Sequence, residues 1–288
     1  MFPQSTNDTV SLPVRQLDFN YTNFGTFVGG GSYHLLSYPR IYNLAFRTTS
    51  TGETIDIDSP GHYQNASYHL DFSGPAIKCT PADEEFLNNL TYRYGAGSGR
   101  MIITRFFSWV PTLSLDPLPS EDATASLDLA SEDAARIFVL TNEGDWNVTR
   151  TYNGSSHRRY RQVNVTECLL YNATYDVDYR FQYPSQTRNA SVSGWLNPVA
   201  ILSREDQDGY YIDNPTTHHM LSYAAVMDAF GQLLVGQAKK DKYAVETVTS
   251  TIWKLSPFNW EDGESVAQGL EELFQNITLS LLSDDALM

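Results

Sequence analysis

The clearest hydrophobic pattern in the chain is an alternation that runs from Tyr171 to Phe181. Apolar or aromatic residues occupy every second position, and small polar or charged residues stand between them. A period of two is typical of a strand with one buried and one solvent-facing side. The pattern therefore predicts a half-buried strand within residues 162–182, with Asn172, Asp176 and Asp178 on its solvent-facing side.

A second alternation, in residues 63–72, predicts another half-buried strand. From residue 65 on, its even positions are apolar and its odd positions, His69 and Asp71 among them, are polar. We expect Gly74-Pro75 to end this strand, because both residues commonly interrupt regular structure.

Several shorter segments add to the expected strands. Residues 101–110 and 136–141 are apolar runs that predict buried strands, and residues 33–46 suit either a strand pair or a short helix. Residues 146–161 predict a hairpin that turns at Asn153-Gly154. The first 31 residues are polar and rich in glycine, which favours a loop.

A period near 3.6 predicts helices elsewhere. The clearest covers residues 265–282; weaker patterns cover 220–237 and 81–92. We expect Glu271→Lys to be tolerated and Phe274→Asp to detach the C-terminal helix from the body of the protein. The apolar stripe of that helix comprises Leu270, Phe274, Ile277 and Leu281, and its polar face comprises Glu271, Glu272 and Gln275.

These elements predict an α+β fold that is rich in strands, with a mainly antiparallel meander sheet and a few helices, including the amphipathic C-terminal one. We expect one domain spanning residues 1–288. Residues 111–134 carry six acidic residues and three prolines but no lysine or arginine. This composition predicts a mobile acidic loop between the two halves of the domain.

The composition is most unusual in its N-glycosylation motifs. Of the 17 asparagines, ten begin an Asn-X-Ser/Thr motif, whereas the 51 serines and threonines among 288 residues predict roughly three by chance. We therefore expect glycosylation, and hence an extracellular or luminal location. The ten candidate sites are Asn7, Asn20, Asn65, Asn89, Asn147, Asn153, Asn164, Asn172, Asn189 and Asn276.

Charge and targeting signals narrow the class further. The net charge of −15 excludes nucleic acid as a partner, because a phosphate backbone is bound by a basic surface. The N-terminal sequence lacks the basic and apolar regions of a secretory signal, and no segment has the apolar density of a membrane span. We therefore expect a fragment of a longer membrane protein, attached to the membrane through segments that are absent from this chain.

The two cysteines, Cys79 and Cys168, are expected to form a disulfide bond, because an oxidising compartment favours pairing and no third cysteine competes. If Asn172 faces solvent, the alternation of the strand places Leu170 on the same side, away from the tyrosines. An apolar side chain is unfavourable on a solvent-facing side, so another segment should cover Leu170. We expect the segment after Gly74-Pro75 to provide this cover, and a bulge near Glu167 to contribute to the geometry.

Most catalytic and metal-binding motifs are absent or incomplete. His218-His219 with Asp213 lacks the spacing of a metal site on a helix, and Gly95–Gly99 fails the nucleophile-elbow pattern. Residues 206–209 imitate part of a calcium loop but lack its flanking ligands. The basic cluster at residues 157–161 is best explained as a solvated hairpin tip. We therefore expect neither a cofactor nor a metal.

One pair of carboxylates keeps an enzymatic alternative open. Asp176 and Asp178 lie on the same side of the predicted strand, with Cα atoms roughly 6.6 Å apart by strand rise, which is compatible with a glycoside hydrolase acting on cell-wall sugar. The simpler explanation is a hydrated strand face that carries the Asn172 glycan.

Three blocks of sequence carry a family resemblance. Residues 73–79, 166–175 and 270–280 together resemble the large extracytoplasmic region of uncharacterised fungal multi-pass membrane proteins. The resemblance implies transmembrane helices before the first residues and after the last helix, and it implies no catalytic residues.

The sequence thus favours a glycosylated ectodomain with a sensing, adhesion or ligand-binding role, with a cell-wall or carbohydrate ligand as the candidate partner; the abundant tyrosine and tryptophan residues are an argument for the hydrolase. The hydrolase described above and a purely structural ectodomain are the alternatives.

Overall fold

The fold was analysed in a computed structural model. It describes residues 9–11, 24–28, 32–57, 65–82, 102–109, 113–114, 136–142, 148–152, 156–160, 164–182, 185–199, 215–234, 236–240, 246–248 and 266–284. The strands are β1 (Thr9–Ser11), β2 (Gly25–Val28), β3 (Ser32–Ser37), β4 (Asn65–Pro81), β5 (Ile102–Trp109), β6 (Leu113–Ser114), β7 (Arg136–Asn142), β8 (Val148–Tyr152), β9 (Ser156–Tyr160), β10 (Asn164–Gln182), β11 (Ser185–Pro198), β12 (Gly236–Lys240) and β13 (Glu246–Val248). The helices are α1 (Pro39–Thr51), α3 (Pro215–Leu234) and α5 (Val266–Leu281).

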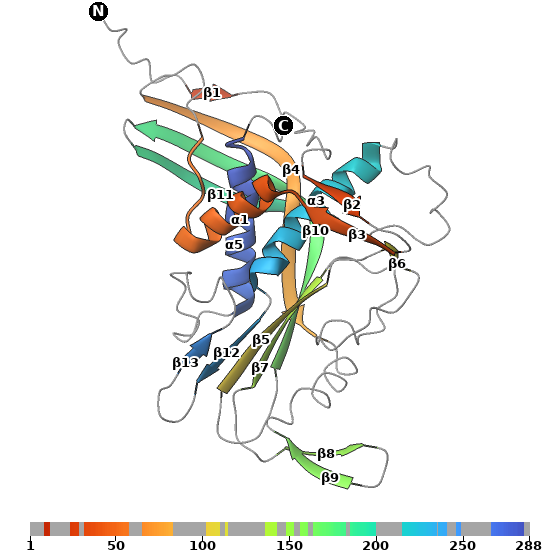
Figure 1. Cartoon of the computed structure of the whole chain (residues 1–288). Helices are drawn as coiled ribbons and strands as arrows, with labels where there is room; N and C mark the ends of the chain where they lie inside the picture. Colours follow the sequence, from red (N-terminus) through yellow and green to blue (C-terminus); the bar gives the residue numbers. More distant parts are fainter. Residues whose placement is uncertain are drawn as a thin grey trace, which may run out of the picture.

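The fold is α+β and strand-rich, as the sequence predicts (Figure 1). The main sheet has the order β1-β4-β10-β7-β5-β12-β13, and β11 also pairs with β10. Its pairs are antiparallel except for β1 and β4. Consecutive strands are neighbours at β10–β11 and β12–β13, whereas β4 and β10 come together from distant parts of the chain.

Several predicted elements are confirmed. Residues 101–110 and 136–141 contain β5 and β7, and the predicted C-terminal helix is α5. Residues 33–46 divide between β3 and α1. The proline at the first turn of α1 favours its start, and Gly52, at φ 72° in the left-handed region, ends it. The β8–β9 hairpin forms with Tyr152 opposite Ser156, as a separate two-stranded sheet.

Other predictions are wrong or lie outside the described residues. Residues 1–31 contain β1 and β2, so they are not all loop. The strand of residues 63–72 does not end at Gly74-Pro75 but continues as β4 to Pro81, which excludes Pro81 from a helix. Helix α3 ends at Leu234, and Gln237 belongs to β12. Residues 83–92 and all but β6 of the acidic segment 111–134 lie outside the described residues.

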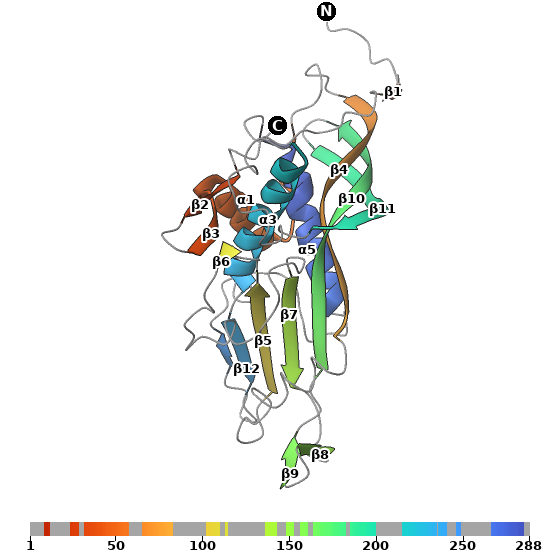
Figure 2. The ribbon, with the colours of Figure 1, turned by 90° about the vertical axis from the view of Figure 1, so that its right-hand side faces the viewer.

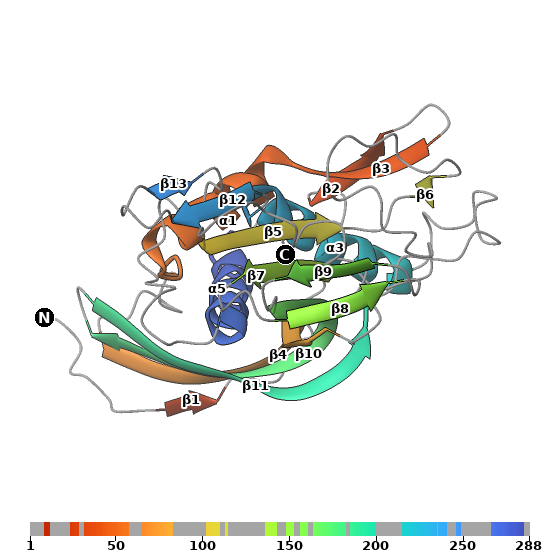
Figure 3. The ribbon, with the colours of Figure 1, turned by 90° about the horizontal axis from the view of Figure 1, so that it is seen from below.

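The long strands β4 and β10 form the centre of the molecule. They pair continuously from Thr166 opposite Pro81 to Gln182 opposite Asn65. Figure 3 shows β4, β10 and β11 curving around α5, and Figure 2 shows α1 and α3 on the same side of these strands as α5. A right-handed twist accumulates along any strand pair, so a pair this long coils strongly.

This coiling changes which side of β10 is buried. From Ala173 to Phe181 the odd positions are buried, and they form a tyrosine core that includes Phe72, Tyr175 and Tyr179 together with Leu279 and Leu282 of the α5 region. Toward the other end the even positions Cys168 and Leu170 are buried instead. They belong to a helical core, which the three helices share with Ile77 and Ile137.

Leu170 is therefore covered, as predicted, but by different elements. The helical core that encloses it is formed largely by α3 and α5, whereas Ile77 lies beside it on the neighbouring strand, directly opposite. The predicted bulge near Glu167 is also absent from the described pairings: β10 runs past it in register with both β4 and β7. The register shifts occur in the β10–β11 pair, on either side of Ala173 and Thr174.

Helix α5 also satisfies backbone groups along the edge of β4. The Cα atoms of the directly opposed residues Cys79 and Cys168 are 4.0 Å apart, which is typical of a pair that exchanges no backbone hydrogen bonds, so the N–H of Cys79 faces away from β10. It donates to Glu271 Oε1 at 2.6 Å. Four residues earlier, the carbonyl of Pro75 accepts from Thr278 Oγ1 at 2.7 Å. Proline is tolerated here because its missing N–H would face the same edge.

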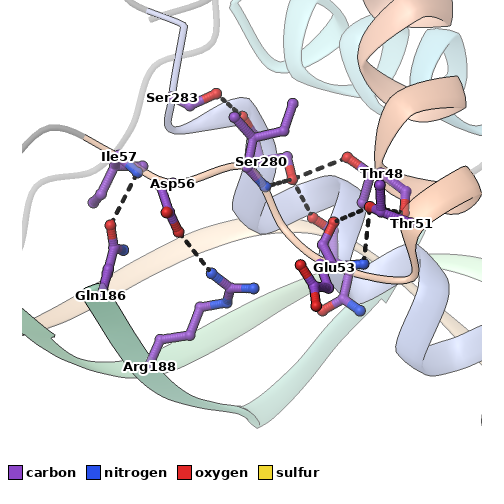
Figure 4. A network of polar contacts seen from close by, with 11 residues as sticks. Thr48, Thr51, Glu53, Asp56, Ile57, Gln186, Arg188, Ser280 and Ser283 are labelled. Atoms are coloured by element: carbon purple, nitrogen blue, oxygen red, sulfur yellow. Dashed lines mark hydrogen bonds and ion pairs between the residues drawn. The ribbon is translucent and has the colours of Figure 1, made fainter. Parts of the chain in front are cut away.

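The segment after α1 is held to α5 and β11 by polar contacts (Figure 4). Ser280 Oγ accepts a hydrogen bond from the N–H of Ile55 at 2.9 Å and lies 3.1 Å from Thr48 Oγ1. The N–H of Ile57 donates to Gln186 Oε1 at 3.2 Å. These contacts hold residues 53–57 against α5 and β11, where Ile57 packs on the tyrosine core.

Candidate functional site

The main charged cluster of the described residues lies on the solvent-facing side of β4 and β10. We call it the His69 cluster; it consists of His69 and Asp71 on β4 and Asp176 and Asp178 on β10. The antiparallel register places Asp178 directly opposite His69, and Asp176 directly opposite Asp71. The β10 alternation that buries Tyr175 and Val177 turns both aspartates outward, as predicted.

The imidazole of His69 contacts all three carboxylates. Its Nδ1 lies 3.0 Å from Asp178 Oδ1 and 3.7 Å from Asp176 Oδ1, and its Nε2 lies 3.3 Å from Asp71 Oδ1. The hydrogen bond to Asp178 is the main cause that raises the pKa of His69; loss of hydration opposes it, and the charges of Asp176, Asp71 and Asp178 raise the pKa further. A protonated His69 thus balances part of the repulsion between carboxylates that face each other across the two strands.

The cluster also has ligand atoms at a spacing that suits a cation. One atom each from His69, Asp71 and Asp176 lies within 4.8 Å of the others. The side chains are between 37% and 58% exposed, so solvent reaches all of them. The imidazolium of His69 and a bound cation would serve the same purpose here, since each neutralises the aspartates.

The predicted carboxylate pair is exposed on the strand face and lies close to one histidine. Asp176 and Asp178 lie on one side of one strand and both approach the same imidazole. In a glycosidase, two carboxyl groups flank the scissile bond. The open position of the two aspartates on a strand face favours a hydrated surface.

The other metal and anion candidates change position or lie outside the described residues. His218 and His219 belong to α3, and Asp213 lies outside the described residues. Residues 95–99 and 206–209 also lie outside them. The basic residues from His157 to Tyr160 form β9 and not the tip of the hairpin.

One buried carboxyl group has a structural role that sequence reasoning missed. Oδ2 of Asp228, on α3, accepts two hydrogen bonds from Ser37, one from its backbone N–H at 3.2 Å and one from its side-chain hydroxyl at 2.7 Å. The same oxygen accepts a third from Gln232 Nε2 at 2.8 Å. Burial raises the pKa of Asp228, and these hydrogen bonds oppose the rise. They tie the end of β3 to α3 just before α1 begins.

The predicted disulfide joins Cys79 to Cys168. The two residues are 89 positions apart in sequence but directly opposite each other on β4 and β10. The bond therefore links the two halves of the chain, as expected, and it is consistent with an oxidising extracellular or luminal location.

The described glycosylation motifs differ in how well they would accommodate a glycan. Asn189 is exposed on β11, opposite Asp178 and thus beside the His69 cluster. Asn172 is half-buried, and its Oδ1 is buried without a hydrogen-bond partner. Asn276 lies on α5, where its Nδ2 donates to the carbonyl of Gly52 at 3.1 Å. The backbone of Asn65 and Asn164 is in β4 and β10, but their side chains, like the whole of Asn7, Asn20, Asn89, Asn147 and Asn153, are outside the described residues.

No helix in the described ranges is both long enough and apolar enough to cross a membrane. Comparison of the chain with protein-family models, with curated proteins and with solved structures found no match.

Proposed function

We propose that this chain is the extracellular or luminal domain of a membrane glycoprotein and that it binds a ligand in a sensing or adhesion role. The observation that carries the proposal is the exposed motif at Asn189, which lies directly opposite Asp178 on the solvent-facing side of the sheet that bears the His69 cluster. A glycan requires open solvent, and that side is hydrophilic. The Cys79–Cys168 disulfide supports the same compartment.

Attachment to the membrane rests on the family resemblance. The attachment would be through segments outside this chain, as in the multi-pass proteins that the three sequence blocks resemble. The glycoside hydrolase is less well supported, because Asp176 and Asp178 approach a common histidine and not a shared substrate position. A purely structural ectodomain would share the disulfide and glycans but would bind no ligand.

The proposal is tested by expressing the chain behind a secretory leader in a eukaryotic host. Mass spectrometry before and after enzymatic deglycosylation gives the occupancy of each motif, and thiol titration without reductant reports the state of the cysteines. We expect several occupied sites, with Asn189 among them, and no free thiol. A secreted, folded chain with no more than two glycans, or with two reactive thiols, would contradict the proposed compartment.

A further inference from the structure

An aromatic surface remains exposed where the sheet changes its buried side. Beyond Ala76 and Ala173, the side of β4 and β10 that contributes Phe72 and Tyr175 to the tyrosine core bears exposed as well as half-buried side chains. On it lie the exposed Lys78 and Trp195 and the half-buried Leu169 and Tyr171, which we call the aromatic patch. Trp195 is directly opposite Ala173 on β11, between the two register shifts of the β10–β11 pair.

The patch is organised by contacts among its own residues. The rings of Tyr171 and Trp195 meet edge to face, with centroids 5.5 Å apart, and the ammonium of Lys78 lies 5.6 Å from the centroid of the Trp195 ring. Yet Trp195 is 38% exposed and its neighbour Leu196 is 49% exposed. Neither belongs to the helical core or to the tyrosine core. These side chains therefore do little for the packing of the fold and leave apolar area in water.

We propose that the aromatic patch is a carbohydrate-binding site that stacks a pyranose ring against Trp195. This names the ligand class of the ligand-binding role proposed above and rests on that role. A pyranose has an apolar face of C–H groups and a rim of hydroxyls, so it suits a flat indole beside polar groups. Lys78 supplies a donor, and the Arg136–Glu167 ion pair, at 2.8 Å, supplies both donors and acceptors on the same side of the sheet.

The size of the patch favours a small ring over a protein partner. An aromatic side chain covers roughly 150–250 Å² in total, so Trp195, which is 38% exposed, presents on the order of 100 Å². A stable protein interface buries roughly 800 Å² on each partner. The exposed area is too small for a second copy of the chain or another folded protein, and it is comparable to one sugar face.

The charge of the patch disfavours a lipid surface. Peripheral membrane binding combines a wide apolar face with several basic residues. Lys78 is the lysine of the patch, and none of the described carboxylates pairs with it. The net charge of the chain is −15. Sugars also need no net charge on the protein, since hydrogen bonds and stacking suffice.

The test uses the full chain, enzymatically deglycosylated so that its own glycans do not compete. The ligands are soluble hexasaccharides of glucose, N-acetylglucosamine and mannose. Binding is measured by isothermal titration calorimetry and by the indole N–H signals in NMR spectra, in which the signal of Trp195 is assigned with the Trp195→Phe variant. We expect at least one to bind with a Kd of about 0.1–10 mM, as befits a small exposed contact, and to shift the Trp195 signal. Trp195→Ala should weaken binding at least tenfold, whereas Trp195→Tyr should retain part of it.

Phe46→Ala is the matched control, because Phe46 is also an exposed aromatic residue but lies on α1, away from the patch. It should leave sugar affinity unchanged. If Trp195→Ala does not fold, Lys78→Ala tests the same surface and should weaken binding. The proposal is overturned if no hexasaccharide binds, if binding is equal in Trp195→Ala and the wild type, or if Trp195 instead mediates binding to neutral lipid vesicles or self-association. Motif occupancy is measured separately, so failure of sugar binding is distinguishable from an error in the proposed compartment.

Discussion

At the residue scale, His69 is the group through which pH acts on the polar side of the sheet. Its folded-state pKa is raised above the ordinary value of 6.5. A group of this kind contributes stability that is fully present below 6.5 and is lost as the pH rises through the raised folded-state value. Its charged neighbours are Asp71 on β4 and Asp176, Asp178 and Arg180 on β10, and the facing residues of β1 and β11 do not titrate.

His69→Gln should therefore lower the melting temperature more at about pH 5.5 than at about pH 9, because the imidazolium that balances the aspartates is present only at the lower pH. Thermal unfolding at the two pH values measures the difference. Ser191→Thr, an uncharged change opposite Asp176 that keeps the glycosylation motif of Asn189, is the control and should show no such dependence. The assignment fails if the two variants respond to pH in the same way.

Gly74 is required by the close approach of α5 to β4. A Cβ atom at this position would lie 3.0 Å from Thr278 Cγ2 and 3.1 Å from Phe72 Cε2. Gly74→Ala should therefore lower the free energy of unfolding by about 1–3 kcal/mol, the usual cost of overpacking. Urea unfolding measures it.

Thr278→Ser provides the matching test, since it removes the methyl group but keeps the hydroxyl that donates to Pro75. The Gly74→Ala/Thr278→Ser double variant should be more stable than the sum of the single effects predicts. Strict additivity would show that the contact with Thr278 does not limit this site.

The sequence contained enough information to find the His69 cluster, but only by combining two predictions. A Cys79–Cys168 bond between directly opposed residues of an antiparallel pair also places His69 opposite Asp178. A disulfide by itself joins two segments, and only the structure shows that its cysteines are directly opposed in the strand register. The contacts of Asp228 with Ser37 were beyond reach, because they depend on how α3 packs against β3.

At the element scale, α5 is the element that the sequence predicts best. Its stripe of Leu270, Phe274, Ile277 and Leu281 is buried throughout, because a strong 3.6-residue period specifies one side of a helix. The polar side is only partly free. Glu272 is exposed, but Glu271 accepts the hydrogen bond from the backbone of Cys79, so our expectation that Glu271→Lys is tolerated conflicts with the structure.

Three substitutions in α5 should consequently form a series. Phe274→Asp should cost about 3–5 kcal/mol, because it removes a fully buried ring that packs on Phe230 and buries a charge. Glu271→Lys should cost about 1–3 kcal/mol by leaving a backbone N–H without its partner. Glu272→Lys should change stability by less than about 0.5 kcal/mol. Denaturant unfolding gives the order, and equal stability of the two glutamate variants would refute the role of Glu271 at the β4 edge.

The boundaries of the strands were harder to predict than α5, for a physical reason. A pattern with a period of two indicates one buried side, but β10 buries opposite sides at its two ends. Around Leu170 the alternation therefore changes phase without any break in the strand. Likewise, Gly74-Pro75 resembles a strand end, and the strand continues because α5 supplies the hydrogen bonds along that edge.

At the scale of the whole molecule, the glycosylation motifs should not be equally occupied. Asn189 is exposed on β11, whereas the Nδ2 of Asn276 is engaged with Gly52 between α5 and the end of α1. We expect higher occupancy at Asn189 than at Asn276, as site-resolved mass spectrometry of the secreted chain would show. Asn189→Gln should remove one glycan and leave the melting temperature nearly unchanged, whereas Asn276→Ala should lower it. High occupancy at Asn276 in the folded protein would contradict this packing.

The shared use of β4, β10 and α5 by two separate cores bears on how the protein unfolds. Each of β4, β10 and α5 contributes residues to both the tyrosine core and the helical core. Neither core can therefore open locally without disturbing the strands and the helix that the other core requires. Local openings are therefore confined to peripheral parts such as the β8–β9 hairpin. The backbone amides of the central strand pair and of α5 should exchange with deuterium through global unfolding, with a single common free energy of opening.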